Sequence, residues 1–572
     1  MYRPQTTTVV MTKPTKSQPS RADAIPDRKS TPWEAHQSLV QGEVASKLQQ
    51  ALTAWSTVLG REHVLFDASQ IQSYAKTTLP EANAPIAIIR PASVEEVVVV
   101  VQVAAELGVP LYPISRGKNW GYGDACPAGE GQVIVDLSRM DRITEFNEEL
   151  GYAVVQPGVT QGQLEEEIRH RESRLMLDVT GAGPDASIVG NALERGFGHT
   201  PYGDHFAHSC NFEVVLADGT VTRTGFGSYV GSQAAHVFPA GLGPSLDGLF
   251  SQSNLGIVTE MTVWLMHRPE HVCAFALQLG EDSQLEEAID GLRELKQANV
   301  LNSAVHVAND LRVMSALVAC PEPELSRRVS LSLETRRRLR AETGTGAWNL
   351  LGGLYGDRQH IRWAKSRIQR RFKGIARPVF FDQRRLRLWN ACARPFRNSH
   401  WFQSKAKKIA SASSALDLLS GVPTREHLQG AFWRNVTEDS QSQDPVQAGL
   451  MWLSPVIPIS GKHARALMTC VETTMTRFGF DPLTTLTAIN SRAMCGVISI
   501  NYDRGIVEQS RQANECYEAL WKQLTEAGYL PYRCGIQSAG KLSSLNGNQS
   551  LLRAIKSTLD PRRILAPGRY GI

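Results

Sequence analysis

The loop at residues 113–123 concentrates side chains that could hold a charged ligand, and it reads Pro-Ile-Ser-Arg-Gly-Lys-Asn-Trp-Gly-Tyr-Gly. Its glycines let the backbone turn sharply and bring N–H groups close to an anion. Arg116 and Lys118 add positive charge suited to phosphate, and Asn119 adds a neutral donor. The loop therefore predicts a pyrophosphate site, although a glycine-rich surface turn explains these residues equally well when they are taken alone.

A second stretch, residues 190–205, carries four glycines among polar side chains. This composition is poor for a core element and good for a loop that lines a ligand. Just before it, residues 181–186 imitate the G-x-G-x-x-A dinucleotide fingerprint. The proline inside that loop and the turn signal Gly190-Asn191 argue against the helix that a Rossmann site requires, so we disfavour that interpretation.

The elements that must position the first loop form one α/β unit. Residues 86–89 are an apolar run typical of a strand, and Ser93 with Glu96 forms a capping box for a helix ending near residue 107. A strand at 109–112 then leads into the loop. The pattern predicts further strands at 133–137, 152–155, 212–216, 221–223, 259–266, 450–453 and 497–501, and helices at 33–52, 163–169 and 516–527.

Length and composition fit a globular protein of two or three domains, because 572 residues can bury large cores and the net charge is only +5. The charge is uneven, since residues 327–408 hold 22 Lys/Arg against 4 Asp/Glu. Such runs usually form solvated helix faces; the alternatives are an acidic protein partner or an anionic membrane surface. No nucleic-acid-binding motif occurs in this window, so we expect no nucleic-acid partner.

Cysteine usage and hydropathy favour a reducing compartment. The nine cysteines are odd in number and lack C-x-x-C spacing, which argues for free thiols and against a metal site or a disulfide framework. No apolar run is long enough to predict a membrane span, and we expect a cytoplasmic protein. Residues 1–35 are polar and predict a disordered tail, with a transit peptide as the alternative.

Four stretches of the chain, in this order, match a known pattern: 113–123, 190–205, 253–258 and the Leu-Ala-Pro-Gly-Arg tail at 565–569. Together they resemble the vanillyl-alcohol oxidase / p-cresol methylhydroxylase family of flavoproteins. The resemblance covers about residue 60 to the C-terminus. It implies an α+β fold, with a two-subdomain FAD-binding domain at 36–268, an α+β cap domain at 269–528 and a return to the FAD-binding domain at 529–572. It also implies FAD-binding roles for Ser115, Arg116, Gly117, Lys118, Asn119, Gly121, Gly190, Asn191, Arg195, Gly196, Thr200, Tyr202, Gly203, Asp204, Ile257, Val258 and Arg569.

The resemblance also implies a phenolic substrate. Tyr122 and the adjacent pair Tyr532-Arg533 match the two tyrosines and the arginine with which family members hold a phenol oxygen. A cation and two hydroxyl donors stabilise a phenolate, which pushes electron density to the para carbon. Hydride can then leave the benzylic carbon for flavin N5, and water can attack the resulting p-quinone methide. Further oxidation of that alcohol would give an aldehyde or ketone.

Departures from the family pattern shape the remaining expectations. Leu450 occupies the place of the histidine that holds flavin covalently in one branch, and residues 421–453 lack the tyrosine used in the other, so we expect non-covalent FAD. The acid that the oxidase branch places beside the flavin has no counterpart at the matching place, and Asp185 lies nearby in a loop that is about one residue longer. This favours dehydrogenase-like behaviour.

His427 falls where the oxidase has a pocket glutamate and could act as the base for water, or could be a partly exposed helix residue. His199 and Thr485 are expected near the pocket.

Two other functions stay open at this stage. One keeps the fold and flavin but acts on a non-phenolic alcohol or a natural-product intermediate. The other is a flavin-binding partner subunit without turnover, with the basic segment as its interface. The electron acceptor is open between oxygen and a carrier such as an acidic electron-accepting protein, and a homo-oligomer is a further expectation.

Overall fold

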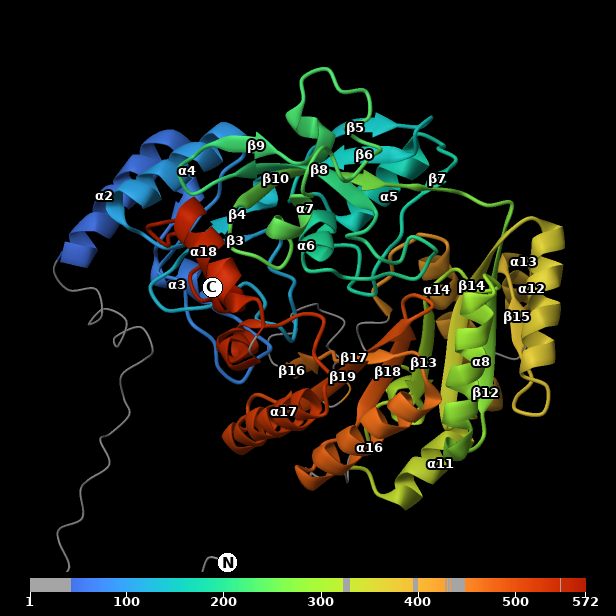
Figure 1. Cartoon of the computed structure of the whole chain (residues 1–572). Coiled ribbons are helices and arrows are strands. Elements are labelled where there is room, and N and C mark those ends of the chain that lie inside the picture. The colour runs from blue at the N-terminus through green and yellow to red at the C-terminus, as the bar shows by residue number, and fades with distance from the viewer. Residues whose placement is uncertain are drawn as a thin grey trace, which may run out of the picture. The chain divides into compact units, whose positions relative to one another are not determined.

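The computed structural model describes residues 43–321, 330–393, 400–426, 430, 433, 448–545 and 547–572 (Figure 1). The predicted tail at 1–35 lies outside these residues. Within them the chain forms a four-stranded, a five-stranded and an eight-stranded sheet, together with a two-stranded pair of β7 (Leu175–Met176) and β11 (Met266–His267). The mixture of helices with separate, largely antiparallel sheets confirms the α+β class.

The first sheet delivers the loop at 113–123. Its strand order is β1-β2-β4-β3, and β2, β4 and β3 are parallel. The connecting helix α4 begins as predicted, because the Ser93 hydroxyl accepts a hydrogen bond from the Glu96 N–H, and it ends at Gly108 with φ of 70°. The sheet and its helices comprise β1 (Val64–Leu65), β2 (Ala87–Ile89), β3 (Leu111–Ile114), β4 (Val133–Asp136), α2 (Glu43–Leu59) and α4 (Val94–Leu107).

The second sheet is antiparallel, in the order β5-β6-β10-β8-β9. Helix α6 begins at Ile188 behind the cap residue Ser187 and continues through Gly190 and Asn191. The prediction that these two residues interrupt a helix was therefore wrong: a capping side chain outweighs the turn preference of a Gly-Asn pair. The elements are β5 (Ile143–Asn147), β6 (Tyr152–Val155), α5 (Gln161–His170), α6 (Ile188–Leu193), β8 (Ser209–Val215), β9 (Val221–Arg223) and β10 (Ile257–Trp264).

The third sheet is antiparallel and draws all of its strands from residues 271–503. Its order is β15-β12-β14-β13-β18-β19-β16, with β17 pairing β19. Helices α8 (Leu285–Gln297), α12 (Arg358–Arg371), α16 (Gly461–Arg477) and α17 (Val507–Glu526) accompany it (Figure 1). The strands are β12 (His271–Leu279), β13 (Val305–Asn309), β14 (Trp348–Gly356), β15 (Val379–Phe381), β16 (Ala448–Leu453), β17 (Val456–Pro458), β18 (Leu483–Ala488) and β19 (Ala493–Asp503).

The register of the third sheet places side chains from distant segments on one face. His306 lies opposite Thr487, and Thr485 lies opposite Val497. Directly opposed residues of an antiparallel pair point to the same side of the sheet. The row that runs from β16 through β19 and β18 to β13 therefore presents these side chains together.

The C-terminal segment returns to the first sheet. Leu565 forms a parallel bridge with Leu111, and the Ala566 N–H donates to the Leu111 carbonyl at 2.7 Å. Helix α18 (Gln549–Leu559), red in Figure 1, lies beside the blue and cyan elements of that sheet. None of the helices in the described part of the chain is long and apolar enough to cross a membrane. The eight cysteines whose side chains are described are all free thiols.

Candidate active site

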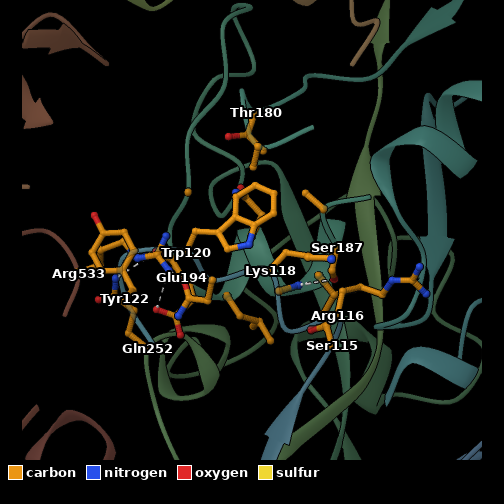
Figure 2. Close-up of a pocket in the computed structure, with 18 of the residues that line it drawn as sticks. Ser115, Arg116, Lys118, Trp120, Tyr122, Thr180, Ser187, Glu194, Gln252 and Arg533 are labelled. Carbon is orange, nitrogen blue, oxygen red and sulfur yellow. Dashed lines mark hydrogen bonds and ion pairs between the residues drawn. The ribbon is translucent and has the colours of Figure 1, made fainter. Parts of the chain in front are cut away.

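A cavity of about 450 Å³ lies where the loop at 113–123, helix α6, the start of β10, the third sheet and the Tyr532-Arg533 pair meet. Figure 2 shows Ser115, Arg116, Lys118 and Ser187 on one side and Tyr122 and Arg533 on the other, with Trp120 between them. The cavity therefore has a cationic, loop-built end and an aromatic end.

The loop-built end fits a diphosphate. The backbone N–H groups of Arg116, Gly117 and Lys118 make no hydrogen bond within the described chain, and neither cation forms an ion pair there. Gly117 has φ of +63°, and a Cβ at Gly190 would lie 2.8 Å from the Ser115 hydroxyl, so the two loops meet only through glycine. Free N–H groups, two unpaired cations and close backbone approach form a nest for phosphate oxygens. These residues therefore suit the pyrophosphate of FAD.

The aromatic end is built from segments more than 400 residues apart in sequence. The Tyr122 hydroxyl lies 2.8 Å from the Ser454 hydroxyl, at the end of β16. The Arg533 guanidinium carbon lies 4.1 Å from the centre of the Tyr122 ring, and Tyr532 packs against Phe197. Arg533 Nε is buried and makes no hydrogen bond within the described chain. Its N–H group is thus a donor without a partner in the described chain, next to the Tyr122 ring.

A buried charge network fixes the Arg533 side chain. Its Nη2 donates to the Asn119 Oδ1 at 2.6 Å and lies 3.6 Å from the Glu194 Oε2. Glu194 in turn accepts hydrogen bonds from Arg569 and from the Tyr570 hydroxyl. Burial alone would raise the pKa of Glu194, but Arg569 and Arg533 lower it, so the carboxylate stays ionised. The network of two cations and one anion carries a net charge of +1.

The two tyrosines remain proton donors over the working pH range. Burial raises the pKa of Tyr532 to about 12, against the opposing influence of Arg533. Burial raises the pKa of Tyr122 further above its usual value, with the nearby Tyr532 adding to the shift. The Arg533 guanidinium keeps its proton: burial would lower its pKa, but Tyr532 and Glu194 raise it. A phenol oxygen entering this end would meet groups that donate and do not accept protons.

Two imidazoles form a hydrogen-bonded pair on the cavity wall. Nδ1 of His199 lies 2.8 Å from Nε2 of His306, whose Nδ1 lies 3.0 Å from the Thr487 hydroxyl. The Asp178 carboxylate accepts a hydrogen bond from the His199 backbone N–H at 3.0 Å and lies 2.7 Å from Nε2 of His205. Burial would raise the pKa of Asp178, but the His205 contact lowers it. The arrangement can hold or move a proton at the cavity wall.

Most of the predicted site residues come together around this cavity, and the others lie outside its lining. The lining contains Ser115, Arg116, Gly117, Lys118, Asn119, Tyr122, Gly190, Asn191, Gly196, Ile257, Val258, Tyr532, Arg533 and Arg569, together with His199, Leu450 and Thr485. Outside it are Gly121, Asp185, Arg195, Thr200, Tyr202, Gly203 and Asp204.

The residues outside the lining have other contacts. The exposed Asp185 pairs with Arg425 at 2.7 Å, and Arg195 donates to the Ser251 hydroxyl at 3.0 Å. Tyr202 stacks on His208. His427 lies outside the described residues. The roles assigned to all of these stay predictions.

Several residues of the cavity were not predicted from the sequence. Glu194, Gln252, His306 and Arg312 line it but belong to no motif. Glu194 stood inside the glycine-rich stretch 190–205, where it is one of only two acids, with Asp204, and this was an available signal. His306 and Arg312 become neighbours of the site only through the strand order of the third sheet.

The fold and this cavity define the class of the protein as a flavoprotein. A family model described as "FAD binding domain" matches residues 85–225, which carry both glycine-rich loops.

Full-length relatives define the family. The chain is 31% identical over 539 residues to the "4-cresol dehydrogenase [hydroxylating] flavoprotein subunit" of Pseudomonas putida, covering 93% of this chain and 97% of that protein. It is 37% identical to the "1'-carboxy-chondrochloren decarboxylase" of Chondromyces crocatus, over 91% and 97% of the two chains. The structure of the 4-ethylphenol oxidase of Gulosibacter chungangensis superposes with a TM-score of 0.83 at 30% identity, over 92% and 98%. The chain belongs to the vanillyl-alcohol oxidase / p-cresol methylhydroxylase family of FAD-dependent oxidoreductases, which confirms the predicted family and cofactor.

Proposed function

We propose that this flavoenzyme oxidises the benzylic carbon of a para-substituted phenol. The carrying observation is the convergence of Tyr122, Tyr532 and Arg533 in one cavity, where the Arg533 Nε–H has no partner within the described chain. The names of the Pseudomonas putida and Gulosibacter chungangensis relatives support a phenolic substrate.

The chain's own residues would prepare the substrate for oxidation. Arg533 and the two tyrosine hydroxyls would hold the substrate oxygen as phenolate, because a fixed cation and two donors favour the charged form. FAD, when bound by the two glycine-rich loops, supplies the hydride acceptor. The His199–His306 pair would take a proton from water that attacks the quinone methide, a role we predicted for His427. We keep the proposal that FAD is non-covalent, because Leu450 lines the cavity in the place of the family histidine.

One cation in the cavity favours a second candidate reaction. Arg312 lines the cavity without an ion pair in the described chain, and one relative is named a decarboxylase. In such a reaction a carboxylate borne by the side-chain carbon adjacent to the benzylic carbon would leave the quinone methide as CO₂. The electrons of the broken C–C bond would form a side-chain double bond and restore the aromatic phenol, so no oxidant besides FAD is needed. Analysis of products for CO₂ separates this reaction from hydroxylation.

The electron acceptor is a further part of the proposal. The Pseudomonas putida relative is named a flavoprotein subunit, which favours a protein partner. We propose an acidic partner at the basic segment, where α12 exposes Arg362, Arg367 and Arg370. Reoxidation of the reduced holoenzyme with and without air tests this: rapid reoxidation by oxygen alone would count against a partner.

Anaerobic mixing of the holoenzyme with 4-ethylphenol, followed by flavin absorbance, tests the central proposal. The O-methyl ether of 4-ethylphenol is the control, because it cannot become a phenolate. We expect bleaching with the phenol only. No bleaching with any 4-alkylphenol, or equal bleaching with the ether, would refute phenol oxidation.

A further inference from the structure

Arg312 is a buried cation that forms no ion pair with any residue in the described part of the chain. It lies on the short helix α9 (Asp310–Met314), directly after β13, and its side chain lines the cavity. Its Nη1 is buried and makes no hydrogen bond within the described chain. Burial lowers the pKa of Arg312 to about 10, so the guanidinium is still protonated at neutral pH.

The nearest acid in sequence is committed elsewhere. Both carboxylate oxygens of Asp310 accept hydrogen bonds from Arg336, at 2.8 and 2.6 Å, which is the bidentate geometry of a strong pair. Among the residues that the structure describes, no carboxylate lies within ion-pair distance of Arg312. A buried charge without a counter-ion is costly, so a cavity that keeps one is built for an anionic ligand.

Arg312 and the aromatic end of the cavity lie at opposite ends of the row of strands β13-β18-β19-β16. Tyr122 contacts Ser454 at the end of β16, whereas Arg312 follows β13. The strands β19 and β18 lie between β16 and β13. At about 4.8 Å per step, three steps separate the two ends by roughly 14 Å. Neutral side chains, including Val497 and Thr485, line the cavity between them.

We propose that Arg312 binds a carboxylate on the side chain of the substrate. The substrate class is then a 4-hydroxyphenyl compound with an anionic para substituent, anchored by its oxygen at Arg533 and by its carboxylate at Arg312. The assignment of the phenol end rests on the proposed function; the carboxylate site rests on Arg312 alone.

The test measures binding without oxidation. The probes are 3-phenylpropanoate and its primary amide, which have nearly the same shape but differ in charge, and neither has a phenol oxygen. Calorimetric titration of the holoenzyme gives the ratio of their dissociation constants. We expect the propanoate to bind about 10- to 100-fold more tightly, as one charge-assisted hydrogen-bonded pair contributes. A propanoate that binds no better than the amide, or does not bind, overturns the proposal.

Variants assign the preference to the residue. Arg312→Met should reduce the ratio to about 1 with unchanged FAD content, and Arg312→Lys should keep part of it. The control Arg553→Met removes an exposed arginine of α18, outside the basic segment, and should leave the ratio unchanged. If the ratio persists in Arg312→Met, the assignment to Arg312 is overturned, whether or not the FAD content falls. If Arg312→Met does not fold, the ratios measured for the wild type and for Arg312→Lys test the assignment instead.

The two proposals fail separately. A normal propanoate-to-amide ratio without bleaching by any phenol would refute phenol oxidation and leave the carboxylate site standing. Bleaching by 4-ethylphenol without a preference for the propanoate would refute the carboxylate site and leave phenol oxidation standing.

Discussion

Replacing Arg533 with Met should make flavin reduction by 4-ethylphenol slow and dependent on pH. Methionine fills a similar volume but offers no charge and no donor. Glu194 keeps its bonds from Arg569 and Tyr570, so the substitution leaves no unpaired buried carboxylate. The fold loses the bond to Asn119 and the contact with the Tyr122 ring. FAD content should therefore be retained.

The magnitude follows from the lost interaction with the phenolate. A hydrogen bond to a charged group contributes about 1.5–3 kcal/mol, which corresponds to a roughly 10- to 150-fold slower rate at fixed pH. Without the guanidinium the bound phenol returns toward its free pKa of about 10. The wild-type rate should then be nearly flat from pH 7 to pH 10, whereas the variant rate should rise with pH over the same range as the phenolate fraction grows.

Anaerobic stopped-flow absorbance across this pH range measures both effects. Arg533→Lys keeps a cation and should recover part of the rate, and Arg553→Met serves as the matched loss of an exposed arginine. A drop that is the same at every pH would show that Arg533 supports structure and does not stabilise phenolate. An unchanged rate would refute the assignment outright.

Three further outcomes are expected. Gly121→Ala should lower the melting temperature and cost about 1–3 kcal/mol, because its Cβ would overlap the Trp452 ring. Gly131→Ala, at a similar φ with no atom within 4 Å, isolates backbone strain, and equal losses would contradict the packing argument. His306→Gln should slow formation of hydroxylated product by about 100-fold while anaerobic flavin reduction stays within about twofold; equal slowing of both would remove the base role. Acid precipitation of the holoprotein should release all yellow colour into the supernatant, and colour retained on the chain would show covalent FAD.

The sequence predicted best where a local rule sets the structure. The Ser93 cap of α4, the strands at 133–137 and 152–155 and the strand pair at 212–216 and 221–223 depend on neighbours in sequence, and all of them form with small shifts at their ends. The predicted capping box forms only in part, because the Glu96 carboxylate accepts from the Ala92 N–H and not from that of Ser93. Six of the eight strands of the third sheet were missed, among them Val305–Asn309 and Leu483–Ala488. Each of these strands pairs with a partner far along the chain, so no local pattern marks them.

The residues of the candidate site likewise divide into those that a local motif predicts and those that only the tertiary fold brings to the cavity. Tyr122 and the Tyr532-Arg533 pair could be predicted because they sit in motifs of the family. His306 and Arg312 could not, because a lone histidine on a strand and a lone arginine on a one-turn helix have no distinctive spacing. Their significance depends on the order β13-β18-β19-β16, which brings them to the cavity wall.

The charges of the cavity discriminate between substrates more sharply than its shape does. At the phenol end Arg533 and Arg569 surround one anion, Glu194, and this leaves one positive charge for a phenolate. Arg312 has no such anion in the described chain, so a neutral alkyl chain at that position would bury an uncompensated cation. A simple 4-alkylphenol would therefore satisfy the aromatic end and leave the other end unpaired, whereas a phenol with an anionic side chain would neutralise both. It follows that 4-ethylphenol should be oxidised as a poor substrate, and that Arg312→Met should improve its binding while weakening that of 3-(4-hydroxyphenyl)propanoate. Opposite changes for two substrates in one variant cannot arise from general loss of stability.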